Sequence, residues 1–284
     1  MGWADIGVGP DYISASQIGM FLRCPRQYYF RYIKGLKRPP SLSMIVGTAM
    51  HKSAEVNYAA KFKTKKPVKL ATALDACSDE FQAKKGEAEK VGKKEEGAEK
   101  DRAIAMSKAH YTEIAPLYQP VAAPELEFKV AVPGLKKKLL GYIDVIVSPI
   151  ANVGKKTEKV LNKRVIRDNK TSGRKFDKLA VEISSQMTAY AHAHNVLFGK
   201  LPDAVGLDIM IAKKDTTIVE VQLATTTRTA EEVARFAETA VQVDKGISAG
   251  SFPPCDDAKI CSWCGYRSIC QPQASKRVAM VSFK

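Results

Sequence analysis

The sequence predicts an α/β fold that combines helices with a central sheet. Two patterns predict it: helix-start signals and helical spacing over the first 60 residues, and short runs of branched apolar residues from Glu125 onward. Gly- and Lys-containing turns separate these runs, which indicates strands of one sheet. The 284 residues have 45% hydrophobic content, enough to bury a substantial core, so one enlarged domain over residues 1–284 is expected.

The N-terminal part, residues 12–60, is expected to be helical. Ser14 fits a helix N-cap with Gln17 as its capping-box partner. Cys24-Pro25 should interrupt this helix, because proline has no amide proton and disfavours helical geometry in the residue before it. A tyrosine-rich helix follows, and a further helix is predicted from Met44 to Ala60.

Residues 75–122 are predicted to form a charged helical insertion. They are rich in Lys, Glu and Ala, most of all from Lys84 to Lys100, and their apolar residues show little periodicity. This pattern is typical of exposed helix, so a mobile insertion is expected.

Residues 125–225 should hold the sheet. Branched apolar runs predict three strands, Leu126–Val132, Leu139–Val147 and Val160–Arg167. The later segments predict a helix over Glu182–Leu197, paired strands Leu207–Ile211 and Thr217–Leu223, and an amphipathic helix Ala230–Val243.

The charge of the chain favours a polyanionic partner. The formal net charge is +15, and residues 1–70 hold 12 Lys/Arg against 3 Asp/Glu, which gives +9. Counterion release from phosphates makes nucleic acid the leading partner for such a surplus. Charge alone leaves simple solubility as an equal alternative.

No membrane or secretion signal is expected. Residues Met1 to Pro10 lack a basic start and an apolar run, and no stretch approaches the roughly 20 apolar residues that span a bilayer. A soluble, cytoplasmic protein is therefore expected. Six cysteines in such a protein favour metal ligands or buried apolar fillers over disulfides.

Three cysteines near the C-terminus, within residues 255–272, have ligand spacing. Cys261, Cys264 and Cys270 form a C-x2-C-x5-C unit, and three thiolates so close can converge on one inorganic centre. A fourth ligand could be Cys24, Cys77 or Cys255. Cys255 would suit a local zinc knuckle, whereas Cys24 would have to be brought back across the fold.

Two carboxylates and a lysine form a second constellation. Asp144 lies within an apolar strand, where an unpaired charge is costly. A second predicted strand ends in Asp168-Asn169-Lys170, and strand alternation puts Asp168 and Lys170 on the same side. Carboxylate oxygens suit Mg²⁺, and an ammonium suits a phosphate, so the set fits phosphodiester hydrolysis.

These motifs resemble the core of the RecB-like branch of PD-(D/E)xK nucleases, in which a G-x-x-D strand precedes a (D/E)-x-K strand. The resemblance implies that Asp144, Asp168 and Lys170 are catalytic and that the Asn169 backbone carbonyl is an extra metal ligand. Gln186 and Tyr190 match the Q-x-x-x-Y element of that branch and should contact DNA or support the site. His51 matches its upstream histidine, which approaches the metal.

The match departs from the family at two points. The second acid is Asp168 instead of the commoner Glu, and the acid before G-x-x-D could be Glu125 or Glu127, of which Glu127 is preferred. The remaining histidines are expected to be structural, namely His110, His192 and His194.

The cysteines resemble the split ligand set of AddB-type helicase-nucleases and of CRISPR-associated spacer-acquisition nucleases. The resemblance implies a [4Fe-4S] cluster held by one early and three late cysteines, Cys24, Cys261, Cys264 and Cys270. It also implies a restriction-endonuclease-like core, a mixed central sheet flanked by helices, with a helical N-terminal region and a C-terminal iron-sulfur turn. A structural zinc site that uses Cys255 remains the alternative.

The resemblance implies a DNA exonuclease dependent on Mg²⁺ or Mn²⁺, with one or two ions at the site. Single-stranded DNA or end-containing duplex is the expected substrate, in recombination, repair, or phage or CRISPR DNA metabolism in a bacterial or phage-infected cell. The chain has no P-loop lysine motif, so unwinding would need a helicase or recombination partner. The alternative is a non-catalytic nucleic-acid-binding module with a zinc or iron-sulfur centre.

Overall fold

The computed structural model describes residues 9–214 and 216–271, which form two compact units. The sheet unit comprises Pro39–Val130 and Leu140–Phe236. The cysteine unit comprises the described residues up to Arg38, Ala131–Leu139, and those from Ala237 onward. The predicted helical part 12–60 is thus divided between the two units, and residue 272 of the predicted cysteine segment lies outside the described residues.

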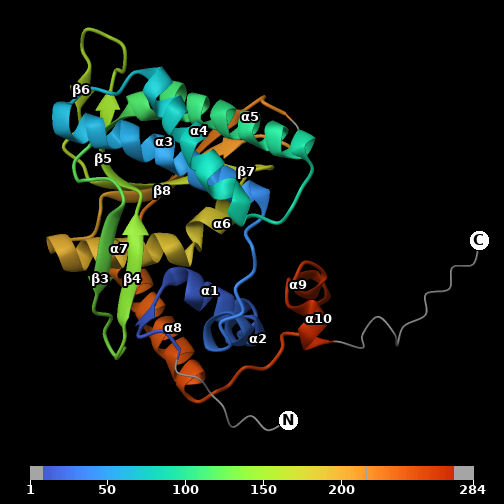
Figure 1. Cartoon of the computed structure of the whole chain (residues 1–284). Helices are drawn as coiled ribbons and strands as arrows, with labels where there is room; N and C mark the ends of the chain where they lie inside the picture. The colour runs from blue at the N-terminus through green and yellow to red at the C-terminus, as the bar shows by residue number, and fades with distance from the viewer. Residues whose placement is uncertain (1–8, 215, 272–284) are drawn as a thin grey trace, which may run out of the picture. The chain divides into compact units, whose positions relative to one another are not determined.

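The sheet unit is built on a mixed sheet, as predicted (Figure 1). The strand order is β2-β5-β7-β8-β9, in which β7 and β8 are parallel and the other neighbours antiparallel. The strands are β2 (Tyr118–Pro120), β5 (Val145–Ala151), β7 (Val165–Ser172), β8 (Ala204–Ile211) and β9 (Glu220–Thr226), and the short β6 (Lys159–Val160) pairs with β5. A further strand, β3 (Leu126–Val130), neighbours β4 (Lys138–Ile143).

Two predicted strands are divided in the structure. The run Leu139–Val147 breaks at Asp144, between β4 and β5, and the run from Val160 to Arg167 is split between β6 and β7. The predicted pairing of the two later strands is confirmed, since β8 and β9 are antiparallel neighbours.

Helices flank the sheet. In Figure 1, α3 (Leu42–Thr64), α4 (Leu70–Lys84) and α5 (Lys93–Ala109) lie on one side and α7 (Ser185–Phe198) on the other. Short helical segments adjoin them: η2 (Lys85–Glu87) links α4 to α5, η3 (His110–Ile114) and η4 (Ala115–Leu117) follow α5, and α6 (Lys178–Glu182) precedes α7. Hydroxyl caps begin two of the helices, because Ser41 accepts from Met44 N before α3 and Ser184 accepts from Met187 N before α7.

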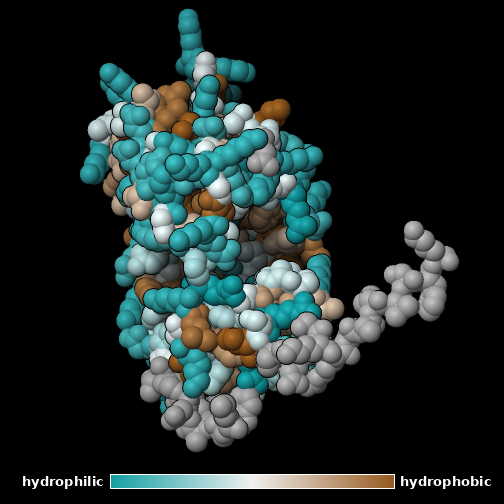
Figure 2. All heavy atoms as spheres, turned by 45° about the vertical axis from the view of Figure 1, so that its right-hand side comes forward, coloured by the Kyte–Doolittle hydropathy of each residue, from teal (hydrophilic) through white to brown (hydrophobic). Residues whose placement is uncertain are grey.

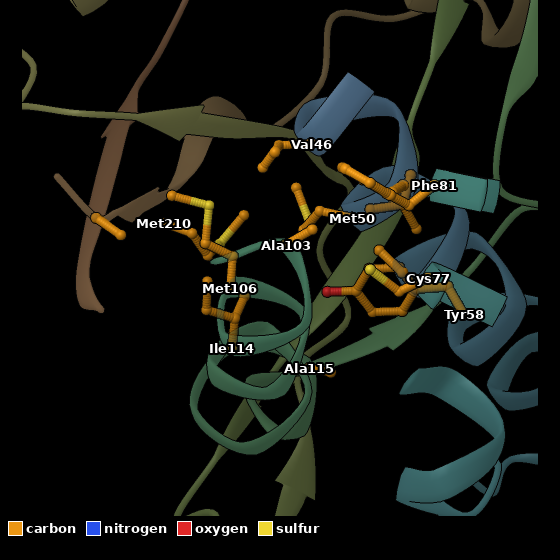
Figure 3. Close-up of a cluster of buried hydrophobic side chains, with 14 of the residues drawn as sticks. Val46, Met50, Tyr58, Cys77, Phe81, Ala103, Met106, Ile114, Ala115 and Met210 are labelled. Carbon is orange, nitrogen blue, oxygen red and sulfur yellow. The ribbon is translucent and has the colours of Figure 1, made fainter. Parts of the chain in front are cut away.

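Helices α4 and α5 contribute a buried face to the main core, so the expectation of exposed helix was wrong for that face. Cys77 and Phe81 of α4, with Ala103 and Met106 of α5, are buried in one cluster with residues of α3 and β8 (Figure 3). The outward faces of these helices are charged, and hydrophilic side chains cover the upper part of the view in Figure 2. The helices were expected from the sequence, but their buried face was not.

The cysteine unit joins early and late parts of the chain. Strand β1 (Tyr12–Ile13) pairs in parallel with the start of β4, and is followed by α1 (Ala15–Arg23), α2 (Pro25–Tyr28) and η1 (Tyr29–Ile33). The later elements are the C-terminal part of α8 (Ala230–Ser248), α9 (Ala258–Ser262) and α10 (Arg267–Cys270). The predicted cap at Ser14 and the interruption at Cys24-Pro25 are confirmed. Phe252 packs against Phe21 and Tyr28, which holds the two ends of the chain together.

Every helix in the described residues is too short or too polar to cross a lipid bilayer.

Candidate active site

Asp144 occupies the break between β4 and β5, where its side chain is buried with 8% of the residue exposed. Strands β5 and β7 are antiparallel with Val145 opposite Arg167, which brings Asp144 next to the Asp168-Asn169 segment. Its Oδ2 accepts a hydrogen bond from the backbone amide of Asn169 at 2.7 Å. Burial, and then the charge of Asp168, raises the pKa of Asp144 to about 7. The carboxylate therefore sits where a cation would stabilise its charged form.

His51 of α3 reaches the same point. Its Nδ1 lies 3.3 Å from Asp144 Oδ2, and its Nε2 lies 2.7 Å from the backbone oxygen of Asn169. Both ring nitrogens thus face acceptors, although a neutral imidazole carries only one proton. A second proton, or a cation between the ring and the carboxylate, is needed to satisfy both contacts. A divalent metal fits this donor set.

Glu125 completes a convergent group of ligands. Ligand atoms of His51, Glu125 and Asp144 all lie within 4.8 Å of one another. Glu125 has a left-handed backbone with φ of 52°, an uncommon conformation for a residue other than glycine. Burial raises the pKa of its carboxyl, as it does for Asp144.

Glu127, the glutamate preferred from the sequence, points elsewhere. It is exposed, and its carboxylate accepts a hydrogen bond from Tyr142 Oη at 3.1 Å. The preference between the two glutamates therefore changes to Glu125. Alternation along a regular strand cannot distinguish the two glutamates, because residues two apart fall on the same side. In the structure the left-handed turn at Glu125, just before β3, separates them.

Asp168 of β7 is held from three directions. Lys170 Nζ lies 2.5 Å from its Oδ2, which confirms that the two side chains share one side of the strand. Its Oδ1 accepts from Gln186 Nε2 at 3.1 Å and from Tyr190 Oη at 3.2 Å. Gln186 Nε2 also lies 2.7 Å from Tyr190 Oη, so the two α7 residues act as one clamp. The Q-x-x-x-Y element therefore contacts Asp168 directly.

An open groove gives access to these residues. It is lined by residues of α3 and α4 and by the segments around β3 and β4, namely Thr48, His51, Lys52, Glu55, Glu80, Glu125 and Tyr142. Two of the three convergent ligands, His51 and Glu125, line it. A substrate in solution can therefore approach the ligand set.

The other histidines lie in the interior. His110, His192 and His194 are 2%, 5% and 0% exposed, which agrees with the structural role expected for them. Burial lowers the pKa of His110 to about 3, so this side chain is neutral at ordinary pH.

Five of the six cysteines line one cavity of the cysteine unit: Cys24, Cys255, Cys261, Cys264 and Cys270. Gln27 Nε2 donates to Cys264 Sγ at 3.1 Å, a bond that connects the early helix to the late turn. Cys77 is fully buried in the core of the sheet unit. The structure thus brings the C-x2-C-x5-C unit together with both remaining candidates for the fourth ligand, Cys24 and Cys255.

The sequence profile of the PD-(D/E)XK nuclease superfamily matches residues 12–271, which include all of these features. The chain belongs to this superfamily.

The chain is also similar in fold to a solved structure, that of a "Putative exonuclease" from Eubacterium rectale. It has 12% sequence identity and a TM-score of 0.54, and the match covers 96% of this chain and 91% of that one. A second solved structure, that of SSO0001, has 13% identity and a TM-score of 0.42, with 93% and 88% coverage. No curated protein matches the chain.

The clamp on Asp168 can be tested by removing one hydroxyl. Tyr190→Phe deletes the bond to Asp168 Oδ1, and the loss of a hydrogen bond to a charged group, about 1.5 kcal/mol or more, corresponds to roughly a tenfold slower nuclease reaction. The rate of DNA cleavage at saturating substrate measures it. Tyr111→Phe is the matched control, because that hydroxyl donates to the Val68 carbonyl at 2.6 Å. Equal rates in both variants would show that Tyr190 does not position Asp168.

Proposed function

We propose that the protein is a metal-dependent DNA exonuclease. The observation that carries the proposal is the convergence of two buried carboxylates, a lysine and a histidine-glutamate pair at the edge of an open groove. The membership of the superfamily supports a nuclease, and the solved "Putative exonuclease" shares the fold.

His51, Glu125 and Asp144 would hold a divalent ion, with the backbone oxygen of Asn169 as a further ligand and Asp168 beside the group. Mg²⁺ or Mn²⁺ suits such oxygen ligands and, when bound, supplies Lewis-acid polarisation of a phosphate and a water of lowered pKa. The proposal includes one ion or two, and Asp144 and Asp168 are the carboxylates that would hold a second one.

Lys170 would stabilise charge on the scissile phosphate. Its ammonium group pairs with Asp168 and its side chain is 30% exposed, so the lysine would face a bound substrate without leaving its carboxylate. Gln186 and Tyr190 fix the carboxylate that orients this lysine. The proposed roles therefore form one chain of contacts from α7 through Asp168 to the phosphate.

Exonuclease action can be separated from endonuclease action with circular DNA. We expect linear DNA labelled at its 5′ or 3′ end to lose nucleotides from one end, while closed single-stranded circles stay intact. Electrophoresis of the products over time reports the polarity and the preferred strand state. Cleavage of the circles at the rate of the linear DNA would be consistent with a nuclease but would contradict exonuclease action.

We also propose that the cysteine unit holds a [4Fe-4S] cluster on Cys24, Cys261, Cys264 and Cys270. The support is the cavity that these thiols line together, and the hydrogen bond from Gln27 to Cys264 Sγ, which would stabilise a thiolate ligand. Cys255 lines the same cavity, so a zinc site that uses it is the competing arrangement. The cluster would tie Cys24, at the start of α2, to the C-terminal turn and stabilise the unit, whereas the zinc site would join C-terminal cysteines only.

Cluster ligation can be tested with two serine variants. Protein purified without oxygen should be brown, with about four iron and four sulfide per chain. Cys24→Ser should lose most of the iron and lower the melting temperature of the protein, whereas Cys255→Ser should keep the colour. A colourless wild type with one zinc per chain would contradict the cluster. Iron loss in Cys255→Ser but not in Cys24→Ser would show that Cys255 is the fourth ligand instead of Cys24.

A role at DNA ends in recombination or repair is part of the proposal. It is supported by the resemblance of the carboxylate and cysteine constellations to those of end-processing nucleases, and by the basic charge of the chain.

A further inference from the structure

A basic segment of the cysteine unit is left unexplained by the proposed active site, whose residues all belong to the sheet unit. Residues 23–38 contain six cations and no Asp or Glu, so they supply +6 of the formal net charge of +15. Four of these cations are exposed: Arg23, Lys34, Lys37 and Arg38. A stretch of one charge sign on a surface attracts a polyanion.

This segment contacts the cysteine turn, residues 261–270. Tyr266 Oη donates to the backbone oxygen of Leu36 at 2.7 Å. Arg38 lies against Gly265, where an added Cβ would come within 2.6 Å of Arg38 Cδ. These two contacts hold residues 36–38, and with them the end of the basic segment, against the turn.

Trp263 is an aromatic side chain of the cysteine turn. It stands between Cys261 and Cys264, and 58% of it is exposed, which is unusual for the largest apolar side chain. The guanidinium of Arg23 lies over its ring, 5.3 Å from the centroid. We call Arg23, Lys34, Lys37, Arg38 and Trp263 the basic-aromatic surface.

We propose that the basic-aromatic surface binds single-stranded DNA, with its cations on the phosphates and a base stacked on Trp263. The choice of DNA rests on the proposed function, but the residues of this surface belong to the cysteine unit, whereas the ligand set around Asp144 belongs to the sheet unit. A single strand fits better than a duplex, because an indole can stack only on a base that has left its own stack. Arg23 adds a planar cation beside the same base.

The test uses full-length protein carrying Asp168→Asn, so that binding is measured without cleavage, and fluorescein-labelled oligo(dT) as the probe. Fluorescence anisotropy should show that Trp263→Ala weakens binding roughly 5- to 100-fold, as expected for loss of base stacking. Trp263→Phe keeps an aromatic ring and should recover most of the affinity. A blunt hairpin duplex should bind more weakly and be insensitive to Trp263→Ala.

Charge is tested with a matched pair of triple variants. Replacing Lys34, Lys37 and Arg38 with Gln should weaken oligo(dT) binding and lower the slope of log K against log salt by about 2, since each cation contributes about 0.7 for a single strand. The control replaces Lys155, Lys156 and Lys159 with Gln, which removes the same charge from exposed positions of the sheet unit. The control should leave affinity and slope nearly unchanged.

The outcomes separate this inference from the proposed function. Unchanged oligo(dT) affinity in both Trp263→Ala and the Lys34/Lys37/Arg38 variant overturns the proposal that this surface binds single-stranded DNA, even if the wild type digests DNA. Equal losses in the two triple variants also overturn it, because the charge effect would then be unspecific. Tight, Trp263-dependent binding, together with a wild type that digests no DNA with any metal, supports the binding surface and contradicts the proposed nuclease function.

Discussion

Asp168→Asn is expected to cleave DNA on the order of a thousandfold more slowly than the wild type, because metal and charge stabilisation at such sites contribute several kcal/mol. The substitution preserves size but removes the negative charge that holds Lys170 Nζ at 2.5 Å and that adjoins the ligand group around Asp144. Lys170 and the clamp of Gln186 and Tyr190 would then lose their common partner. Initial rates on end-labelled DNA at saturating Mg²⁺ or Mn²⁺ measure the loss.

The matched control for this variant is Asp101→Asn, at an exposed position of α5. It removes the same charge from the same unit and should cleave at the wild-type rate. An Asp168→Asn protein that keeps its melting temperature and cleaves within a few-fold of the wild type would show that the reaction takes place elsewhere.

Arg167→Met should lower the free energy of unfolding by about 3–5 kcal/mol, because it leaves a buried carboxylate without its cation. Arg167 and Asp208 are paired with side chains only 1% and 0% exposed. The guanidinium also donates to Leu207 O and Thr225 Oγ1 at 2.8 Å each. Burial raises the pKa of Asp208, and the charge of Arg167 opposes that rise. Urea unfolding followed by circular dichroism measures the change.

Two further variants test this explanation. Arg174→Met, at an exposed position, should leave the free energy of unfolding within about 0.5 kcal/mol of the wild type. Arg167→Met combined with Asp208→Leu should recover part of the loss, since no charge is then left buried alone. If the double variant is less stable than Arg167→Met alone, the orphaned carboxylate is not the cause.

Local periodicity was sufficient for the parts of the site that lie on regular elements. Strand alternation predicted that Asp168 and Lys170 share a side, and helical spacing predicted that Gln186 and Tyr190 share a face; both arrangements are present. Cap chemistry likewise predicted the start of α1 at Ser14. These features depend on neighbours in the chain, which the sequence displays directly.

Features set by tertiary contacts or unusual backbone were not predictable in this way. The left-handed conformation of Glu125, which directs its carboxylate to the ligand group, and the strand break at Asp144 depart from regular strand geometry, so the preference for Glu127 could not be corrected from the sequence. Ala73, Ala103 and Met106 of α4 and α5 are fully buried, but they stand among many charged residues in the sequence. The apolar periodicity of the two helices is therefore weak, although each has a buried face. In the sequence, Arg167 is a polar residue within a predicted strand. Its partners follow only from the register of β7 against β8 and of β8 against β9.

Metal dependence of the wild type is the most direct test of a hydrolytic centre at His51, Glu125, Asp144 and Asp168. End-labelled single-stranded and duplex DNA would be incubated with the protein after EDTA treatment, and again after addition of excess Mg²⁺ or Mn²⁺. We expect no digestion in EDTA and full digestion after either ion is restored. Equal digestion in EDTA, or none under any ion, would contradict the account.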